Sequence, residues 1–184
     1  MTNMKKLLLS ALLGLFCIGA SAQIVTSTSR MKTVTRHYEG VIGWQVAVDG
    51  LCVIGPYWYL CSGAEVSAGY RYPSGLYLGG QVGGGYGDME GKFSGGYVPF
   101  RFDARYYFSS NRVQPYAQFA TGIFFLFGGG IAPYNIQIGP GVSVGITNAL
   151  SVQLAINADL ALSAAAGVKF APTEKVGVTY HFGL

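Results

Sequence analysis

A strict alternation of apolar residues with polar or small ones along 150–162 constrains the fold more than any other feature of this sequence. One alternate set is apolar: Leu150, Val152, Leu154, Ile156, Ala158, Leu160 and Leu162. The other set is small or polar: Ser151, Gln153, Ala155, Asn157, Asp159 and Ala161. A period of two indicates a β-strand with two different faces. A polar face with so few charges is typical of an enclosed lumen, and the apolar face then turns to lipid.

Seven further segments show the same alternation, so the sequence predicts an all-β fold: an eight-stranded antiparallel up-and-down transmembrane β-barrel. We expect strands over 38–49, 63–72, 76–87, 97–108, 113–127, 135–147, 150–162 and 176–182. Connections after even-numbered strands are short and the others are longer, as in outer-membrane barrels with both termini in the periplasm. The segment 163–175 fits an extension of the seventh strand, the start of the eighth, or a separate hairpin.

The N-terminus has the features of a secretory signal peptide. Lys5 and Lys6 precede the apolar segment 7–18, which is too short to span a bilayer as a helix, and Ala20-Ser21-Ala22 forms a small-residue cleavage site. Bulky Phe16 disfavours the alternative in which Cys17 is a lipoprotein cysteine. The sequence therefore predicts a signal peptide over 1–22, a short periplasmic segment over 23–36 and the barrel over 37–184.

The composition excludes several classes of protein. Hydrophobic residues make up 51% and charged residues 11% of the chain, with 28 glycines, 13 tyrosines and 11 phenylalanines. Without Lys5 and Lys6, 10 basic residues face 8 acidic ones, and no basic stripe suggests nucleic-acid binding. A soluble barrel of the lipocalin or avidin kind is the structural alternative. It would expose a face of Ser, Gln, Asn, Ala and Gly that solubilises poorly.

The signal peptide, the eight amphipathic strands and the terminal segment VGVTYHF (176–182) together resemble the small eight-stranded outer-membrane barrels of the OmpA/OmpX type. The resemblance implies a location in the cell outer membrane, contact with its lipid and lipopolysaccharide, and recognition of the last strand by the barrel-insertion machinery. The usual pattern ends on Phe, whereas Gly183 and Leu184 follow Phe182 here. We expect no peptidoglycan-binding domain after the barrel, so cell-wall tethering is not implied.

Charged residues on the predicted inner faces are the first candidate functional group. They are Glu65, Arg71, Arg101, Asp103, Arg105 and Asp159. Charges inside a membrane protein are costly unless they are paired, so we expect a network of salt bridges. The network is either a structural plug or a charged gate in a narrow, anion-selective pore. The small lumen of an eight-stranded barrel favours the plug.

Two cysteines and an aromatic motif fall in the predicted first external loop. Cys52 and Cys61 can form a disulfide in the oxidising export compartment. Strand parity turns position 52 outward and position 61 inward, so this disulfide requires a bulge or an irregular loop. Between them, Tyr57-Trp58-Tyr59 is either part of the interfacial aromatic girdle or a patch for a surface ligand, whose identity the sequence does not indicate.

Glu39 and His181 lie on the first and last predicted strands, which pair to close the barrel. We expect a hydrogen bond or ion pair between them at this seam. Barrel enzymes of the lipid A deacylase or palmitoyltransferase class use His with Ser and an acid, but by resemblance their chemistry lies at the outer rim. The sequence has no marked serine nucleophile and no metal-ligand spacing. We therefore predict no catalytic residue, no metal and no cofactor.

These observations lead to one functional hypothesis with two alternatives. The leading hypothesis is an integral outer-membrane protein that contributes to envelope integrity or to surface interaction through its loops. The alternatives are a narrow pore for small solutes or ions and a lipid-modifying barrel enzyme.

Overall fold

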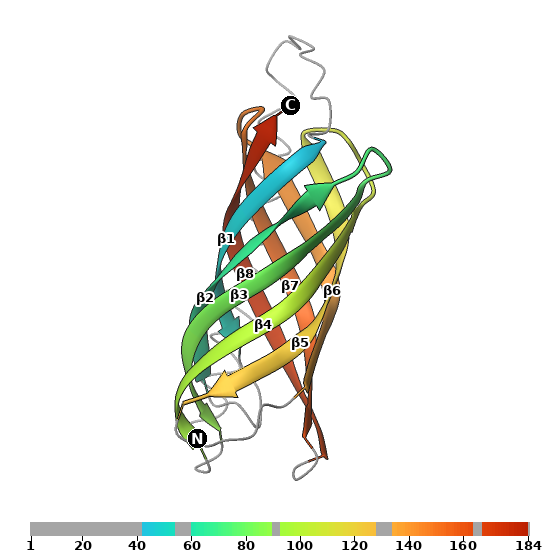
Figure 1. Ribbon diagram of the computed structural model, residues 1–184. Helices are drawn as coiled ribbons and strands as arrows, with labels where there is room; N and C mark the ends of the chain where they lie inside the picture. The colour runs from blue at the N-terminus through green and yellow to red at the C-terminus, as the bar shows by residue number, and fades with distance from the viewer. Residues whose placement is uncertain (1–41, 54–59, 90–92, 128–133, 164–166, 184) are drawn as a thin grey trace, which may run out of the picture. The chain divides into compact units, whose positions relative to one another are not determined.

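The computed structural model describes residues 42–53, 60–89, 93–127, 134–163 and 167–183, which form one closed antiparallel barrel (Figure 1). Each strand pairs with its neighbours in sequence, and β1 pairs with β8. The strands are β1 (Gly43–Val53), β2 (Leu60–Arg71), β3 (Leu76–Met89), β4 (Phe93–Tyr107), β5 (Val113–Leu126), β6 (Tyr134–Gly145), β7 (Leu150–Ser163) and β8 (Gly167–Gly183). The predicted fold class is confirmed. The described residues include no helix with the length and apolar character needed to cross a membrane.

The seam between β1 and β8 defines the two ends of the barrel. Gly43 pairs with Gly183 at one end of this seam, and Val53 pairs with Thr173 at the other. Because Arg71 also pairs with Gly43, the turn 72–75 lies at the end where β1 begins and β8 ends. We call this end the terminus end and the opposite one the loop end.

Several predicted strand limits are wrong, mostly at the loop end. The first strand runs over Gly43–Val53, whereas 38–49 was predicted. Residues 88–96 were predicted to be a loop between the third and fourth strands, but most of them belong to the ends of β3 and β4. The last strand begins at Gly167 rather than at 176, so most of the ambiguous segment 163–175 belongs to β8. Every backbone N–H and C=O within a bilayer needs a partner, and ladder pairing therefore extends strands through glycine and polar residues that have weak strand propensity. The predicted segments 1–22 and 23–36 lie outside the described residues.

The polar face of the sheet lines the interior of the barrel and the apolar face forms its exterior, which is the reverse of a soluble barrel. Ile156 in the middle of β7 is 62% exposed, whereas its near neighbour Gln153 is 3% exposed. Other large apolar residues exposed on the outer face include Val48, Val66, Val82, Phe100, Phe102, Phe119, Ile123, Ile138, Val176 and Val178. This outer surface suits lipid, and the predicted orientation of the faces is confirmed.

Aromatic side chains gather on the outer surface near the terminus end. They are Trp44, Tyr70, Tyr72, Tyr106, Phe108, Tyr180 and Phe182. Neighbouring rings make edge-on contacts, with centroids 5.8 Å apart in Trp44–Tyr70 and 4.9 Å apart in Tyr180–Phe182. Edge-on geometry is favourable for aromatic quadrupoles, and amphipathic rings at this height fit an interfacial girdle.

Inward-facing glycines make room for bulky side chains in the lumen. A Cβ atom at Gly177 would lie within 3.0 Å of the Asp49 carboxylate and of the Val48 carbonyl oxygen. A Cβ atom at Gly141 would likewise collide with the ring of Tyr116. Outward-facing Gly50 differs, because its added Cβ atom would be 3.7 Å from the nearest atom, an ordinary contact. The many glycines on the inner face are therefore a steric requirement of a filled lumen.

Two substitutions on the same seam test this requirement. Gly177→Ala should lower the free energy of unfolding by about 1–3 kcal/mol, because the new methyl group overpacks Asp49. Gly50→Ala is the matched control, since Asp49 pairs with Gly177 and Gly50 pairs with Val176. We expect Gly50→Ala to be neutral or slightly stabilising. Urea unfolding of the refolded barrel in micelles measures both, and equal effects would contradict the steric explanation.

The orientation of the faces is tested on β7. Leu154→Arg should destabilise the barrel by about 2–4 kcal/mol in lipid, because it places a charge in the apolar band. Leu154→Met should change stability much less, since it conserves volume and polarity. In a single-cysteine scan of 150–162, lipid-attached quenchers should quench probes at even-numbered positions only. Quenching at odd-numbered positions would mean that the apolar face is an ordinary protein core.

Candidate functional site

The lumen is filled by buried polar side chains that form three layers, which we call the loop-end, middle and terminus layers. In the loop-end layer, Glu65 accepts hydrogen bonds at Oε2 from Lys175 Nζ (2.7 Å) and Gln81 Nε2 (2.7 Å). The guanidinium of Arg101 pairs with the other oxygen, Oε1. Glu65 is fully buried, and two cations with one amide compensate the loss of its hydration.

Asp159 is the second carboxylate of the loop-end layer. Its Oδ2 atom lies 3.7 Å from Arg101 Nη2 and accepts a hydrogen bond from Gln137 Nε2 (3.2 Å). Asn135 Nδ2 donates to Oδ1, and Asn135 Oδ1 accepts from Arg101 Nε (2.8 Å). Arg101 therefore bridges β2, β6 and β7 across the lumen.

Arg105 organises the middle layer. It donates through Nη2 and Nε to Asp103 Oδ2 (2.6 and 2.9 Å) and through Nη1 to Gln153 Oε1 (2.9 Å). Gln153 in turn donates to Asp49 (2.5 Å), whose other oxygen lies 3.9 Å from Arg105 Nη2. The ring of Tyr77 packs 5.2 Å from the guanidinium carbon. The layer connects β1, β3, β4 and β7 through one buried cation.

Arg71 and His181 belong to the terminus layer. Arg71 donates to Gln114 Oε1 (2.6 Å), and its guanidinium carbon lies 4.0 Å from the ring centroid of Tyr107. His181 Nε2 and Ser151 Oγ are 2.9 Å apart and share a hydrogen bond. The residue opposite His181 on β1 is Gln45. Glu39, the predicted seam partner of His181, lies outside the described residues.

The structure places all six predicted lumen residues inside the barrel. The ion pairs formed within the described ranges include Glu65, Arg101, Asp103, Arg105 and Asp159. The prediction omitted Lys175 and Asp49. Lys175 was missed because the predicted last strand began one residue later. Asp49 lies on the polar face of the first predicted strand, so the alternation of that strand could have identified it as a lumen residue.

The described lumen charges balance. Four cations and four carboxylates are buried there: Arg71, Arg101, Arg105, Lys175, Asp49, Glu65, Asp103 and Asp159. Ion pairs of opposite charge reduce the cost of removing each group from water. The balanced set can therefore fill the lumen without leaving a net charge within the membrane.

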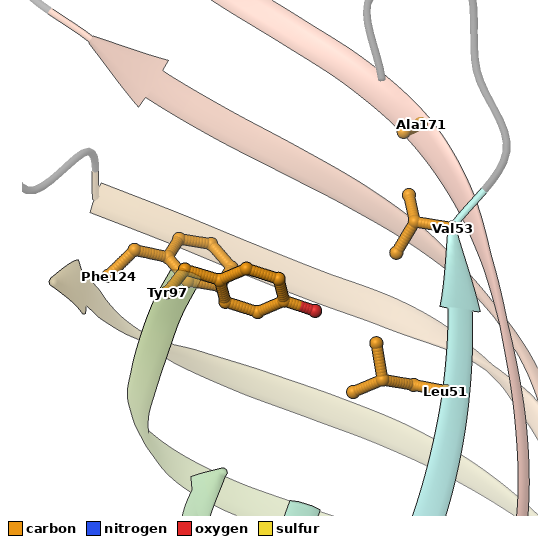
Figure 2. Close-up of a cluster of buried hydrophobic side chains, with 5 residues drawn as sticks. All are labelled: Leu51, Val53, Tyr97, Phe124 and Ala171. Carbon is orange, nitrogen blue, oxygen red and sulfur yellow. The ribbon is translucent and has the colours of Figure 1, made fainter. Parts of the chain in front are cut away.

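An apolar collar lies on the loop-end side of the polar layers, and Figure 2 shows its side chains. Its side chains come from β1, β4, β5 and β8: Leu51, Val53, Tyr97, Phe124 and Ala171. Tyr97 and Phe124 meet edge-on with centroids 5.7 Å apart, and Figure 2 shows Leu51 and Val53 pointing towards this pair. Below the collar is a cavity of about 20 Å³ bordered by Gln137 and Asp159, which has room for about one water molecule.

The predicted disulfide stays a prediction. Cys52 is half-buried, and its register partner on β2 is Ser62. Cys61 pairs with Val53, so the two cysteines are offset by one residue in the register of β1 and β2. The motif Tyr57-Trp58-Tyr59 lies outside the described residues. Within the described ranges, no group of three or more His, Cys, Asp or Glu side chains could hold a metal ion.

Comparison of the structure with solved proteins shows the same fold. Neisserial surface protein A (NspA) superposes with a TM-score of 0.59 at 18% identity, over 78% of this chain and 100% of that one. The N-terminal β-barrel domain of Pseudomonas aeruginosa OprF gives a TM-score of 0.48 at 15% identity (75% and 97% coverage). The outer-membrane enzyme PagL gives 0.46 at 15% identity (75% and 99%). The chain has the fold of the small eight-stranded outer-membrane barrels. No protein-family model matches the sequence, and no curated protein matches it.

Glu65 provides the sharpest test of the loop-end layer. Glu65→Gln leaves Arg101 and Lys175 facing each other without their shared carboxylate, so we expect a loss of about 3–5 kcal/mol in unfolding free energy. Adding Lys175→Met should recover part of that loss. Glu174→Gln, the adjacent outward-facing carboxylate, is the control and should have little effect. Urea titration in micelles measures all four proteins, and an unchanged midpoint for Glu65→Gln would show that the layer is hydrated.

Proposed function

We propose that this protein is a non-enzymatic, sealed barrel of the outer membrane that contributes to envelope integrity or to surface interaction through its external loops. The observation that carries the proposal is the filled lumen. Three layers of hydrogen-bonded side chains cross it, and the apolar collar lies above them. An ion entering the lumen would have to displace buried ion pairs at several successive levels, which argues against continuous conduction.

The buried pair of Ser151 and His181 does not favour an enzyme. Ser151 is 1% exposed and His181 is 4% exposed, so a lipid or other large substrate has no access to the hydroxyl. No carboxylate is recorded as a partner of His181 among the described residues, although such an acid would orient a catalytic imidazole. The pair is better explained as a seam contact that joins β7 to β8.

Planar-bilayer recording tests the sealed lumen. Protein that shows the heat-dependent gel mobility of a folded barrel should give no stepwise currents at neutral pH. The charge-balanced variant Glu65→Ser with Arg101→Ser removes one anion and one cation from the loop-end layer, and we expect it to pass small stepwise currents. It serves as the positive control for insertion. Stepwise currents from the wild-type protein would contradict the plug and favour the narrow pore.

The enzymatic alternative has its own test. Lipid A from cells with and without the gene should give the same mass spectrum, because the lumen offers no accessible nucleophile. A mass difference of one acyl chain that depends on the gene would contradict the proposal. Ser151→Ala would then show whether the buried hydroxyl takes part.

A further inference from the structure

A single carboxyl group interrupts the apolar outer surface of the barrel. Glu174 lies between the buried residues Thr173 and Lys175 on β8, so its half-buried side chain faces the lipid. It pairs with Cys52 on β1 and with Ile156 on β7, which has three apolar members of the β7 row on either side. Among the strand side chains that the structure describes, Glu174 is the one charged group on the outer face.

Glu174 lies between two belts of exposed aromatic rings. One belt is the girdle near the terminus end, which includes Tyr180. The other lies towards the loop end and consists of Tyr86, Phe125, Phe127, Tyr134 and Phe170. On β8, Tyr180 is six residues from Glu174 and Phe170 is four. For a strand tilted by about 40°, these separations correspond to about 15 and 10 Å along the membrane normal. Because the apolar band is about 25 Å tall, the carboxyl group lies deep within the hydrocarbon, and its short side chain does not reach either interface.

No described side chain of the barrel compensates this carboxyl group. None of them forms an ion pair with Glu174, whereas each of the four carboxylates described in the lumen has a cation beside it. An isolated charge in hydrocarbon is costly, so a carboxyl group without a cation enters it as the neutral acid, which has one O–H donor and acceptor oxygens. Lipid tails satisfy neither. A partner that donates and accepts hydrogen bonds at this depth would therefore stabilise the group.

The surface around Glu174 is shallow enough for a second protein to approach closely. Two cross-strand rows form this surface, which we call the outer patch: Glu174, Cys52 and Ser62 in one row, and Gly50, Ala64 and Gly84 in the other. A Cβ atom added at Gly50 or Gly84 would lie 3.7 or 3.9 Å from its nearest neighbour, so packing within the barrel does not require glycine there. The outer face of β4–β7 is bulkier and includes Phe100, Phe102, Phe119, Ile123, Ile138 and Ile156. In a bilayer, small residues permit close approach and hydrogen bonds hold proteins together.

We propose that the outer patch is the interface of a symmetric dimer, in which the Glu174 carboxyl group hydrogen-bonds to its counterpart in a second copy of the chain. Two barrels inserted in the same direction are related by a two-fold axis along the membrane normal, so a residue at the axis meets its own copy at the same depth. Two neutral carboxyl groups are self-complementary, because each donates one hydrogen bond and accepts one. The interface lies on the lipid-facing surface, and it does not depend on whether the lumen is sealed.

Sedimentation equilibrium of the folded barrel in density-matched micelles measures the dimer. Glu174→Leu should raise the dissociation constant by about 10-fold or more, because it removes both hydrogen bonds. Glu174→Gln should keep the constant within about 3-fold of the wild-type value, since a primary amide also donates and accepts. Gly84→Leu should weaken the dimer by holding the two barrels apart. Phe119→Leu, on the opposite side of the barrel, is the control and should change nothing. Heat-dependent gel mobility shows that each variant is folded.

A distance measurement in lipid vesicles tests which face forms the interface. Nitroxide labels are attached to the unfolded chain at Val178→Cys, beside the outer patch, or at Phe119→Cys, in protein that also carries Cys52→Ser and Cys61→Ser. After refolding, double electron–electron resonance should give a shorter separation between copies for the label at 178 than for the label at 119.

Three results would overturn the proposal. The first is a wild-type protein that stays monomeric, or a dimer that Glu174→Leu leaves unchanged. The second is a shorter separation for the label at 119, which would place the interface on another face. The third is a loss of association in Glu174→Gln as large as that in Glu174→Leu. The carboxylate would then be required as a charge, and the occupant would be a basic group rather than a second carboxyl group.

Discussion

Because β1 pairs with β8 from Gly43–Gly183 to Val53–Thr173, the sheet has no free edge and its backbone groups find partners within the barrel. In the hydrocarbon region of a bilayer an unpaired N–H or C=O costs several kcal/mol, so closure is the condition for every other feature. The ladder has gaps beside two prolines, which lack an N–H. Between β3 and β4 the register passes from Val82–Phe100 to Gly85–Tyr97 around Pro99, and between β6 and β7 from Ile138–Ala158 to Gly141–Ala155 around Pro140. Closure with eight strands also fixes a narrow lumen, which has to be filled.

Filling that lumen explains the composition of the inner face. A long side chain on one strand lies over a glycine at the paired position of the neighbouring strand, as Asp49 lies over Gly177 and Tyr116 over Gly141. The charged residues among them need partners of opposite sign at the same level. Arg101 and Arg105 are four residues apart on β4 and point the same way, yet they pair with different carboxylates in adjacent layers. The layers are therefore a consequence of the two-residue period of the strand.

The alternation of the sequence was sufficient to predict the fold class, the strand count and the inward orientation of Arg101, Asp103 and Arg105. Strand parity carries this information directly, because one face meets lipid and the other does not. The ends of strands at the loop end were not predictable in the same way. There the inner face itself becomes apolar at Leu51 and Val53, which removes the contrast between faces. Lys175 was left out of the predicted last strand for a related reason. Pro172 and Glu174 interrupt the outer apolar pattern of β8, and this interruption is also typical of a turn. Which cation pairs with which carboxylate depends on the register across non-neighbouring strands. Local sequence patterns carry no information about that register.

The two ends of the lumen differ in chemistry, and this difference bears on where the protein can act. At the loop end an apolar collar adjoins the buried ion pairs of the lumen. At the terminus end Arg71 borders an open recess beside the first residues of β1. Among the described residues, the Ser151 hydroxyl and the His181 ring are buried, and the cavity beside the collar has room for about one water molecule. In the function that we propose, interaction therefore falls to the connections between strands, which the barrel would support at the membrane.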